Sequence, residues 1–303
     1  MPELAESWEA SADVKTWVFK IRTGVEFHNG KTLTAEDVVY SLNLHRAEDS
    51  KSSVRPIMSG ISEIKATAPN EVTISLAEPN AGLPSVMAMF NLIVVPDGET
   101  DFAAGIGTGG YILENFEQGV RSLVKRNPNY WKEDRAHFDA VEILAVKDSS
   151  ARTTGIITND LDAINFVEPK TAGLLAKTSD VEILQTPGKA HYCYSLRTDM
   201  APADQSDVRL ALKYAIDRED FLNKILKGYG SLGNDQPLSK AYASFDDSIE
   251  QRIYDPDKAR SLMRKAGALD HVFKLHVSDT PFSGAVDGAA LYSEHAAKAG
   301  NKN

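Results

Sequence analysis

Strand-like and helix-like patterns alternate along the second half of the chain, and this order constrains the fold most. Mostly apolar residues fill 141–146 and 162–167, and helix patterns follow them at about 149–158 and 169–177. Strands that alternate with helices in this way are typical of a sheet covered by helices. The sequence therefore predicts an α/β fold rather than an all-β one.

The first half begins with a strand, a turn and a helix. Residues 14–22 alternate large apolar side chains with mostly polar ones, as in a strand with one buried face. Thr34 is followed by two acidic residues and an apolar stripe, which predicts a helix that begins after it and extends to about residue 46. Two further strands are predicted at 61–67 and 71–77, joined as a hairpin by Pro69 and its neighbour.

The most apolar run of the chain lies at residues 86–95, between two prolines. Periodicity leaves it open whether this run is a buried strand or a short helix that leads into one. The same patterns predict further strands at 120–126, 190–196 and 272–277, and further helices at 206–216, 218–227, 256–266 and about 285–299.

Charge and cysteine content exclude several classes of protein. The 303 residues include 33 Lys and Arg against 43 Asp and Glu, a net charge of −10 that repels nucleic acid and anionic lipid. Cys193 is the only cysteine, so the chain forms no internal disulfide, and the redox compartment stays open. No run of about 18 apolar residues exists. Residues 1–4 lack the features of a signal peptide, so we expect any export signal to lie upstream.

Motifs for cofactor, metal or catalytic chemistry are weak. Residues 105–110 satisfy G-x-G-x-x-G, but a strand-like stretch follows them instead of a helix, so we interpret them as a structural turn. The seven histidines show no metal-ligand spacing, and no G-x-S-x-G is present. The sequence therefore predicts no cofactor, no metal site and no catalytic residues, although a triad assembled from distant residues is not visible at this level.

Aromatic and small polar residues on apolar segments are the best candidates for a binding site. Phe90 and Asn91 lie inside the apolar run, and Tyr192, Tyr194 and Ser195 lie on the predicted strand 190–196. Such mixed positions suit a pocket that stacks on a ligand and hydrogen-bonds its polar groups. The alternative is that the aromatic rings pack in the core. Because neighbours on a strand face opposite ways, Tyr194 and Ser195 are not expected to enter one cleft through both side chains.

Six blocks, in order and spread over most of the chain, resemble a known family. They are LAESWEAS (4–11), TWVFKIRTGVEFHNGKTLTAEDVVYSL (16–42), IGTGGY (106–111), KRNPNYW (125–131), DVRLALKYAIDREDFL (207–222) and YDPDKARSLMRKAG (254–267). Together they are similar to the extracellular solute-binding proteins of family 5, the dipeptide, oligopeptide and nickel-binding receptors of bacterial ABC importers.

The resemblance implies a bilobed α/β fold of the periplasmic binding protein type (type II) with an extra domain. Residues 1–115 would form that extra domain, 116–235 the first ligand-binding domain, and 236–303 the beginning of a second lobe, which we expect to be truncated here. Family members begin before the first block and continue beyond the last helix, so this chain resembles a central fragment.

By position in the family, Phe90 and Asn91 would face the pocket from the extra domain, and Tyr194 and Ser195 would face the ligand. Ser195 stands where the family commonly has Asn, which removes an amide and leaves a peptide, an opine, a sugar conjugate or a metal complex open as the ligand. The implied function is non-enzymatic: capture of a peptide or similar small solute in the periplasm, or tethered outside the membrane, for an ABC permease. The alternatives are a hydrolase with dispersed catalytic residues and a truncated form without a competent site.

Overall fold

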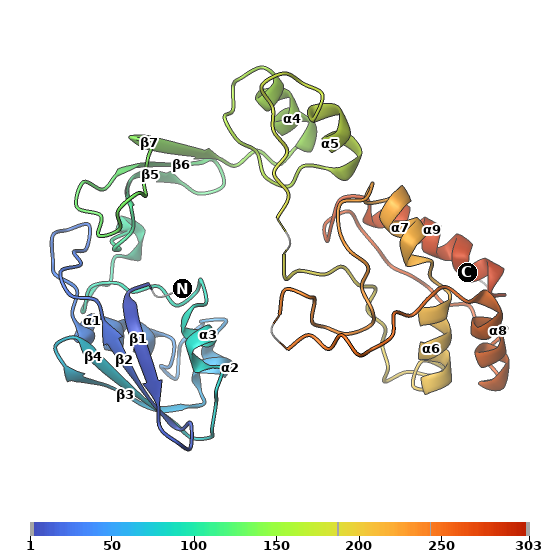
Figure 1. Cartoon of the computed structure of the whole chain (residues 1–303), viewed down its shortest axis with the longest axis horizontal. Helices are drawn as coiled ribbons and strands as arrows, with labels where there is room; N and C mark the ends of the chain where they lie inside the picture. The colour runs from blue at the N-terminus through green and yellow to red at the C-terminus, as the bar shows by residue number, and fades with distance from the viewer. Residues whose placement is uncertain (1–2, 187, 243, 301–303) are drawn as a thin grey trace. The chain divides into compact units, whose positions relative to one another are not determined.

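The computed structural model describes residues 3–186, 188–242 and 244–300, and the chain divides after Ala145 into two compact units (Figure 1). We call the part up to Ala145 unit 1 and the part from Val146 onward unit 2. The domain boundaries expected from the resemblance, 115/116 and 235/236, refer to a longer protein and stay a prediction.

A four-stranded antiparallel sheet with the order β1-β2-β4-β3 forms the first layer of unit 1. Its strands are β1 (Ala5–Ala10), β2 (Thr16–Ile21), β3 (Ile61–Ala68) and β4 (Glu71–Leu76). Trp17 and Phe19 point to the buried face, as the alternation in 14–22 predicts. Helix α1 (Ala35–Leu44) packs on β3 and β4 (Figure 1), so the predicted strand, helix and hairpin are confirmed.

The apolar run 86–95 forms no strand, so of the two alternatives, a buried strand or a short helix that leads into one, only the short helix is present. A short helix, α3 (Leu83–Met87), covers its beginning, and the residues from Ala88 to Val95 are irregular. Leu92 and Val95 still bury their side chains, so this run contributes to the core of unit 1 through single residues rather than through a ladder. Unit 1 also contains α2 (Arg55–Met58) and the short 3₁₀ helix η1 (Phe102–Ala104).

Three antiparallel strands complete unit 1: β5 (Tyr111–Glu117), β6 (Arg121–Arg126) and β7 (Ala140–Leu144). β6 and β7 confirm the strands expected at 120–126 and 141–146. β5 follows the glycines 105–110 directly. Those glycines therefore lack the helix that a dinucleotide fingerprint requires, as the sequence predicts.

The regular secondary structure of unit 2 consists of helices in the described part of the chain, joined by long irregular segments. Its helices are α4 (Ser149–Ile157), α5 (Pro169–Leu175), α6 (Ser206–Tyr214), α7 (Arg218–Lys224), α8 (Pro256–Lys265) and α9 (Ala285–Lys298), and each matches a predicted helix. Val208 and Ala211 of α6 pack with Ala259 and Met263 of α8 in a buried cluster. Small residues at this helix contact let the two backbones approach closely.

Three predicted strands of unit 2 are wrong. Residues 162–167, 190–196 and 272–277 have no regular strand pairing, apart from a single bridge residue at Val272. Alternating or apolar residues favour a strand, but a strand also needs a neighbour whose backbone completes the hydrogen bonds. No such neighbour lies beside these segments in the described residues.

Candidate functional site

Five aromatic side chains gather in unit 2, and we call them the aromatic cluster: Tyr192, Tyr194, Phe221, Phe282 and Tyr292. The ring of Tyr194 stacks on that of Tyr292 at 5.6 Å between centroids and meets Phe221 edge-on at 6.4 Å. Tyr192 stacks on Phe282 at 4.1 Å, and its side chain is largely exposed. The cluster therefore combines a half-buried base with an exposed aromatic surface.

Helices α7 and α9 hold the base of the aromatic cluster. Phe221 lies on α7 and Tyr292 on α9, while Tyr194 reaches α9 from the irregular segment 190–196. Gly288 of α9 makes the approach possible, since a Cβ there would lie 2.5 Å from Cζ of Phe221 and 2.8 Å from the hydroxyl oxygen of Tyr194. The missing side chain at Gly288 thus provides the space that both rings occupy.

Burial favours the neutral form of two phenols of the cluster, Tyr194 and Tyr292. It raises the pKa of Tyr194 to about 12 and raises that of Tyr292 further. The Tyr292 hydroxyl donates to the carbonyl oxygen of Leu212 at 2.9 Å. The Tyr194 hydroxyl has only a long contact of 3.5 Å to the carbonyl oxygen of Ala285, so most of its hydrogen-bonding capacity is unused.

Two guanidinium groups and one carboxylate lie close to the aromatic cluster. Asp235 accepts from Arg218 at 2.7 Å and from Arg252 at 2.6 Å. The side chains of all three residues are at most 25% exposed. The charges of Arg218 and Asp235 both act on the phenol of Tyr292, which places this ion group beside the cluster.

The structure places the four predicted ligand residues in different surroundings. Tyr194 is half-buried in the aromatic cluster, whereas Ser195 is exposed and has no hydrogen bond among the described residues. Phe90 and Asn91 lie in unit 1, in the loop that follows α3; Phe90 is 88% exposed and Asn91 is half-buried. The strand on which we expected Tyr194 and Ser195 is absent, so their different burial does not come from strand alternation.

Sequence reasoning missed Phe221, Phe282 and Tyr292 as partners of Tyr194. Phe221 and Tyr292 look like ordinary core positions of amphipathic helices, and Phe282 lies in a loop. A signal was present in Gly288, a glycine in the interior of a predicted helix, which often marks a close approach.

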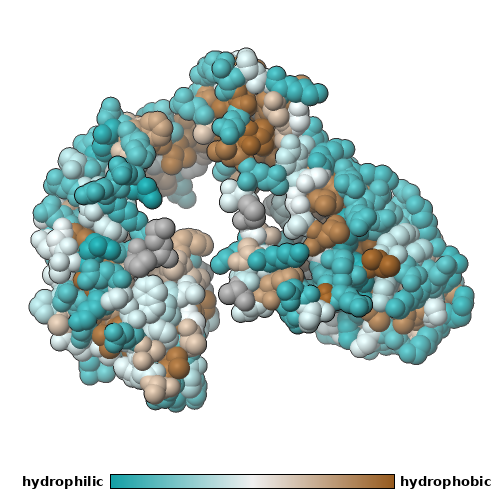
Figure 2. Space-filling view, viewed as in Figure 1, coloured by the Kyte–Doolittle hydropathy of each residue, from teal (hydrophilic) through white to brown (hydrophobic). Residues whose placement is uncertain are grey.

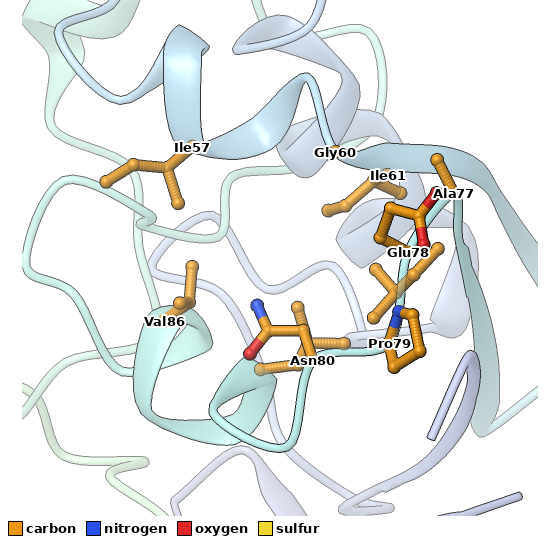
Figure 3. A pocket seen from close by; sticks show the side chains of 10 residues that line it. Ile57, Gly60, Ile61, Ala77, Glu78, Pro79, Asn80 and Val86 are labelled. Atoms are coloured by element: carbon orange, nitrogen blue, oxygen red, sulfur yellow. The ribbon is translucent and has the colours of Figure 1, made fainter. Parts of the chain in front are cut away.

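A small pocket of about 240 Å³ lies in unit 1 beside α3 (Figure 3). Its walls are aliphatic side chains of α2, β3, β4 and α3, with Glu78 and Asn80 among the lining residues. None of the four predicted ligand residues lines it. A second, more polar depression lies on the sheet around Val18, Lys20 and Glu71.

Three of the six sequence blocks meet at one junction in unit 1. The Nε2 atom of His28 lies 3.0 Å from the carbonyl oxygen of Gly109, and its Nδ1 accepts from the Gly107 N–H at 3.3 Å. The amide of Asn127 donates to the same Gly109 oxygen at 3.0 Å. These contacts hold the glycine-rich residues 105–110 in place. We therefore interpret His28, Gly109 and Asn127 as structural residues of the three blocks.

Neither a metal centre nor a membrane span emerges from the part of the chain that the structure describes. No group of three or more His, Cys, Asp or Glu side chains there is arranged to hold a metal ion. The helices of these residues are all too short or too polar to cross a bilayer.

Comparison with known proteins matches nearly the whole chain to one family. A family model described as "Bacterial extracellular solute-binding proteins, family 5 Middle" matches residues 1–300. The dipeptide-binding protein of Escherichia coli K12 is 25% identical over 297 residues, which cover 88% of this chain and 55% of that protein. The glutathione-binding protein GsiB of E. coli O6:K15:H31 is 29% identical over 273 residues, which cover 87% of this chain and 52% of GsiB.

Solved structures agree with these sequence matches. The PBP AgaA of A. tumefaciens R10, solved in complex with agropinic acid, superimposes with a TM-score of 0.81 and is 28% identical. That match covers 99% of this chain and 62% of AgaA. The chain thus spans about half the length of the curated relatives it matches, and its α/β fold is that of a periplasmic binding protein.

Proposed function

Because this chain belongs to family 5 of the bacterial extracellular solute-binding proteins, we propose that it is part of a receptor that captures a small solute outside the cytoplasmic membrane. The receptor would be periplasmic or tethered to the outer face of the membrane, and it would deliver the solute to an ABC permease. The observation that carries this proposal is the family match over residues 1–300.

The aromatic cluster supports a role of Tyr194 in ligand binding. Its stacked rings offer an apolar surface, and the Tyr194 hydroxyl keeps hydrogen-bonding capacity that no protein group uses fully. By its position in the family, Phe90 of unit 1 is a further candidate for ligand contact, and its side chain is 88% exposed. We infer that Tyr194 binds through its ring or hydroxyl, and that Ser195 acts through its main chain. We propose that Asn91 offers its side-chain amide to the ligand.

The names of the relatives suggest several chemical classes of ligand. Those proteins are described as binding a dipeptide, glutathione or agropinic acid. These molecules share carboxylate or amide groups, so we propose a peptide or a similar small polar solute as the ligand of this protein.

Native mass spectrometry tests this proposal directly. The full-length exported protein, purified without denaturation, is expected to carry a small co-purified solute whose mass is lost after unfolding and refolding. Re-addition of that solute to the refolded protein is expected to restore the mass shift and raise the Tm. Absence of any stabilising solute, from purified protein and from a peptide library alike, would contradict the proposal.

A hydrolase with dispersed catalytic residues is the alternative function. The relatives named above are binding proteins, which favours a non-enzymatic role. Incubation with a peptide library, followed by measurement of both thermal shift and product formation, separates the two functions. Products that accumulate in proportion to protein concentration would establish the enzyme instead.

A further inference from the structure

Two cationic side chains meet at one phenol of unit 2 that is not a member of the aromatic cluster. The guanidinium carbon of Arg252 lies 4.8 Å from the ring centroid of Tyr214, and the Nζ atom of Lys258 lies 4.3 Å from it. The pKa of Tyr214 is lowered, first through a hydrogen bond with Lys258 and further through the charges of Lys258 and Arg252. Both cationic groups therefore lie against the ring of Tyr214.

Backbone contacts fix the positions of these residues. Tyr214 is the last residue of α6, and its carbonyl oxygen accepts from the Asp255 N–H at 3.0 Å. Asp255 caps α8 by accepting from the backbone N–H of Lys258 at 2.9 Å. The Nε atom of Arg252 is held by Asp235 at 2.6 Å. The group is thus preorganised, which lowers the entropic cost of binding a ligand.

The carboxylates around this group leave part of the positive charge unpaired. Asp235 divides its charge between Arg252 and Arg218, and the Asp255 carboxylate is engaged at the helix N-terminus. Asp257, also in the first turn of α8, is exposed. In the described parts of the chain, Lys258 pairs with no carboxylate, and no carboxylate or carbonyl oxygen accepts from the terminal nitrogens of Arg252.

We propose that Tyr214, Arg252 and Lys258 form a second binding site, which takes one oxyanion, a carboxylate or a phosphate. The free edge of the guanidinium group matches two oxygens of such an anion. The Lys258 ammonium and the Tyr214 hydroxyl supply further donors. This site includes no ring of the aromatic cluster, so it goes beyond the proposed function.

Nuclear magnetic resonance of the 303-residue chain labelled with ¹³C-tyrosine tests the site. The signal of Tyr214 is assigned with Tyr214→Phe, and the chain is titrated with inorganic phosphate or with succinate at constant ionic strength. We expect a saturable shift of the Tyr214 signal and a rise of its pKa toward the ordinary value, because a bound anion offsets the two cations. Saturation by phosphate alone identifies a phosphate site, and saturation by succinate identifies a carboxylate site.

Matched variants on one helix separate a specific site from general charge effects. Lys258→Gln is expected to raise the Kd about fivefold, the scale of an exposed charge pair, and Lys258→Arg is expected to restore binding. Arg264→Gln removes the same charge from an exposed position of α8 and is expected to leave the Kd unchanged. Shifts that do not saturate, or an equal effect of Lys258→Gln and Arg264→Gln, would overturn the proposal.

Discussion

Tyr194 is half-buried between α7 and α9, and its position depends on the absence of a side chain at Gly288. A tyrosine side chain in such a place has two effects at once. Its ring contributes area to the packing of unit 2, and its hydroxyl presents an oxygen with one weak protein contact among the described residues. The following predictions separate these two contributions.

Gly288→Ala is expected to destabilise the chain. The new methyl group would lie 2.5 Å from Phe221 and 2.8 Å from Tyr194, so both rings must move. Overpacking of this kind costs about 1–3 kcal/mol, which exceeds the roughly 1 kcal/mol that Ala gains over Gly in a helix. Gly173→Ala, in α5 with nothing within 4 Å of its Cβ, is the control and is expected to be neutral or stabilising. Urea unfolding measures both variants, and equal stability of the two would show that the cluster accommodates the methyl group.

Ligand binding is expected to depend on Tyr194 more than on Ser195. In the full-length protein, Tyr194→Ala should weaken binding of the cognate solute by roughly 1–3 kcal/mol, the scale of a lost aromatic contact and a hydrogen bond. Ser195→Ala should change the Kd little. Calorimetry on both variants, with Tyr194→Phe to isolate the hydroxyl, gives the answer. A large loss for Ser195→Ala together with normal binding by Tyr194→Ala would reverse the assignment.

At the scale of the elements, helices were predicted well because their signals are local. The start of α1 is marked by Thr34 and Asp37, and the start of α8 is marked by Asp255 and Pro256. Each of these signals lies within a few residues of the helix boundary. The signal for the hairpin of β3 and β4 is equally local, because the two paired strands follow each other directly in the sequence.

Segments that depend on distant partners were predicted poorly. Residues 162–167, 190–196 and 272–277 have the composition of strands, but pairing decides whether they become strands. The aromatic cluster was hidden for the same reason, because Tyr194 and Tyr292 are far apart in sequence. The sequence identifies Tyr194 as a candidate ligand-binding residue, but only the folded chain shows which rings surround it.

The start of α1 depends on a fully buried carboxylate. The Asp37 side chain accepts from the backbone N–H of Thr34 at 2.8 Å and from that of Asp97 at 2.7 Å, and it pairs with Lys31. Burial opposes its ionisation, but the hydrogen bonds from Lys31, Asp97 and Thr34 outweigh burial and lower the pKa of Asp37 below its ordinary value. Asp37 therefore ties the helix to the loop around residue 97 as an ionised group.

Asp37→Asn is expected to lower the free energy of unfolding by about 2–4 kcal/mol at pH 7, because it removes the charge that Lys31 and the two N–H groups stabilise. A carboxyl whose pKa is lowered by folding stabilises the folded state above its unfolded pKa, about 4, and loses this contribution as the pH falls through its folded pKa. The native chain should therefore lose stability below about pH 4 more steeply than Asp37→Asn. Glu36→Gln, at an exposed neighbour, is the control and should keep the native acid profile. Parallel acid profiles for the native chain and Asp37→Asn would contradict the prediction.

At the scale of the whole molecule, unit 2 exposes several large apolar side chains. Apolar side chains gather over the part of the chain that contains α4 and α5 (Figure 2). Phe166 is 86% exposed and Leu174 is 66% exposed, and Ile157 at the end of α4 is 43% exposed. Single exposed apolar residues are ordinary, but a group of them promotes association.

The 303-residue chain is accordingly expected to self-associate as its concentration rises, since association removes these side chains from water. Leu174→Lys should weaken the association, because it replaces an exposed apolar side chain of α5 by a charge. Ala176→Lys adds the same charge at the exposed residue that ends α5 but removes only a methyl group, so it should weaken association less. Sedimentation velocity over a hundredfold range of concentration measures the effect. A monomer throughout that range, or equal behaviour of the two variants, would show that this apolar surface drives no association.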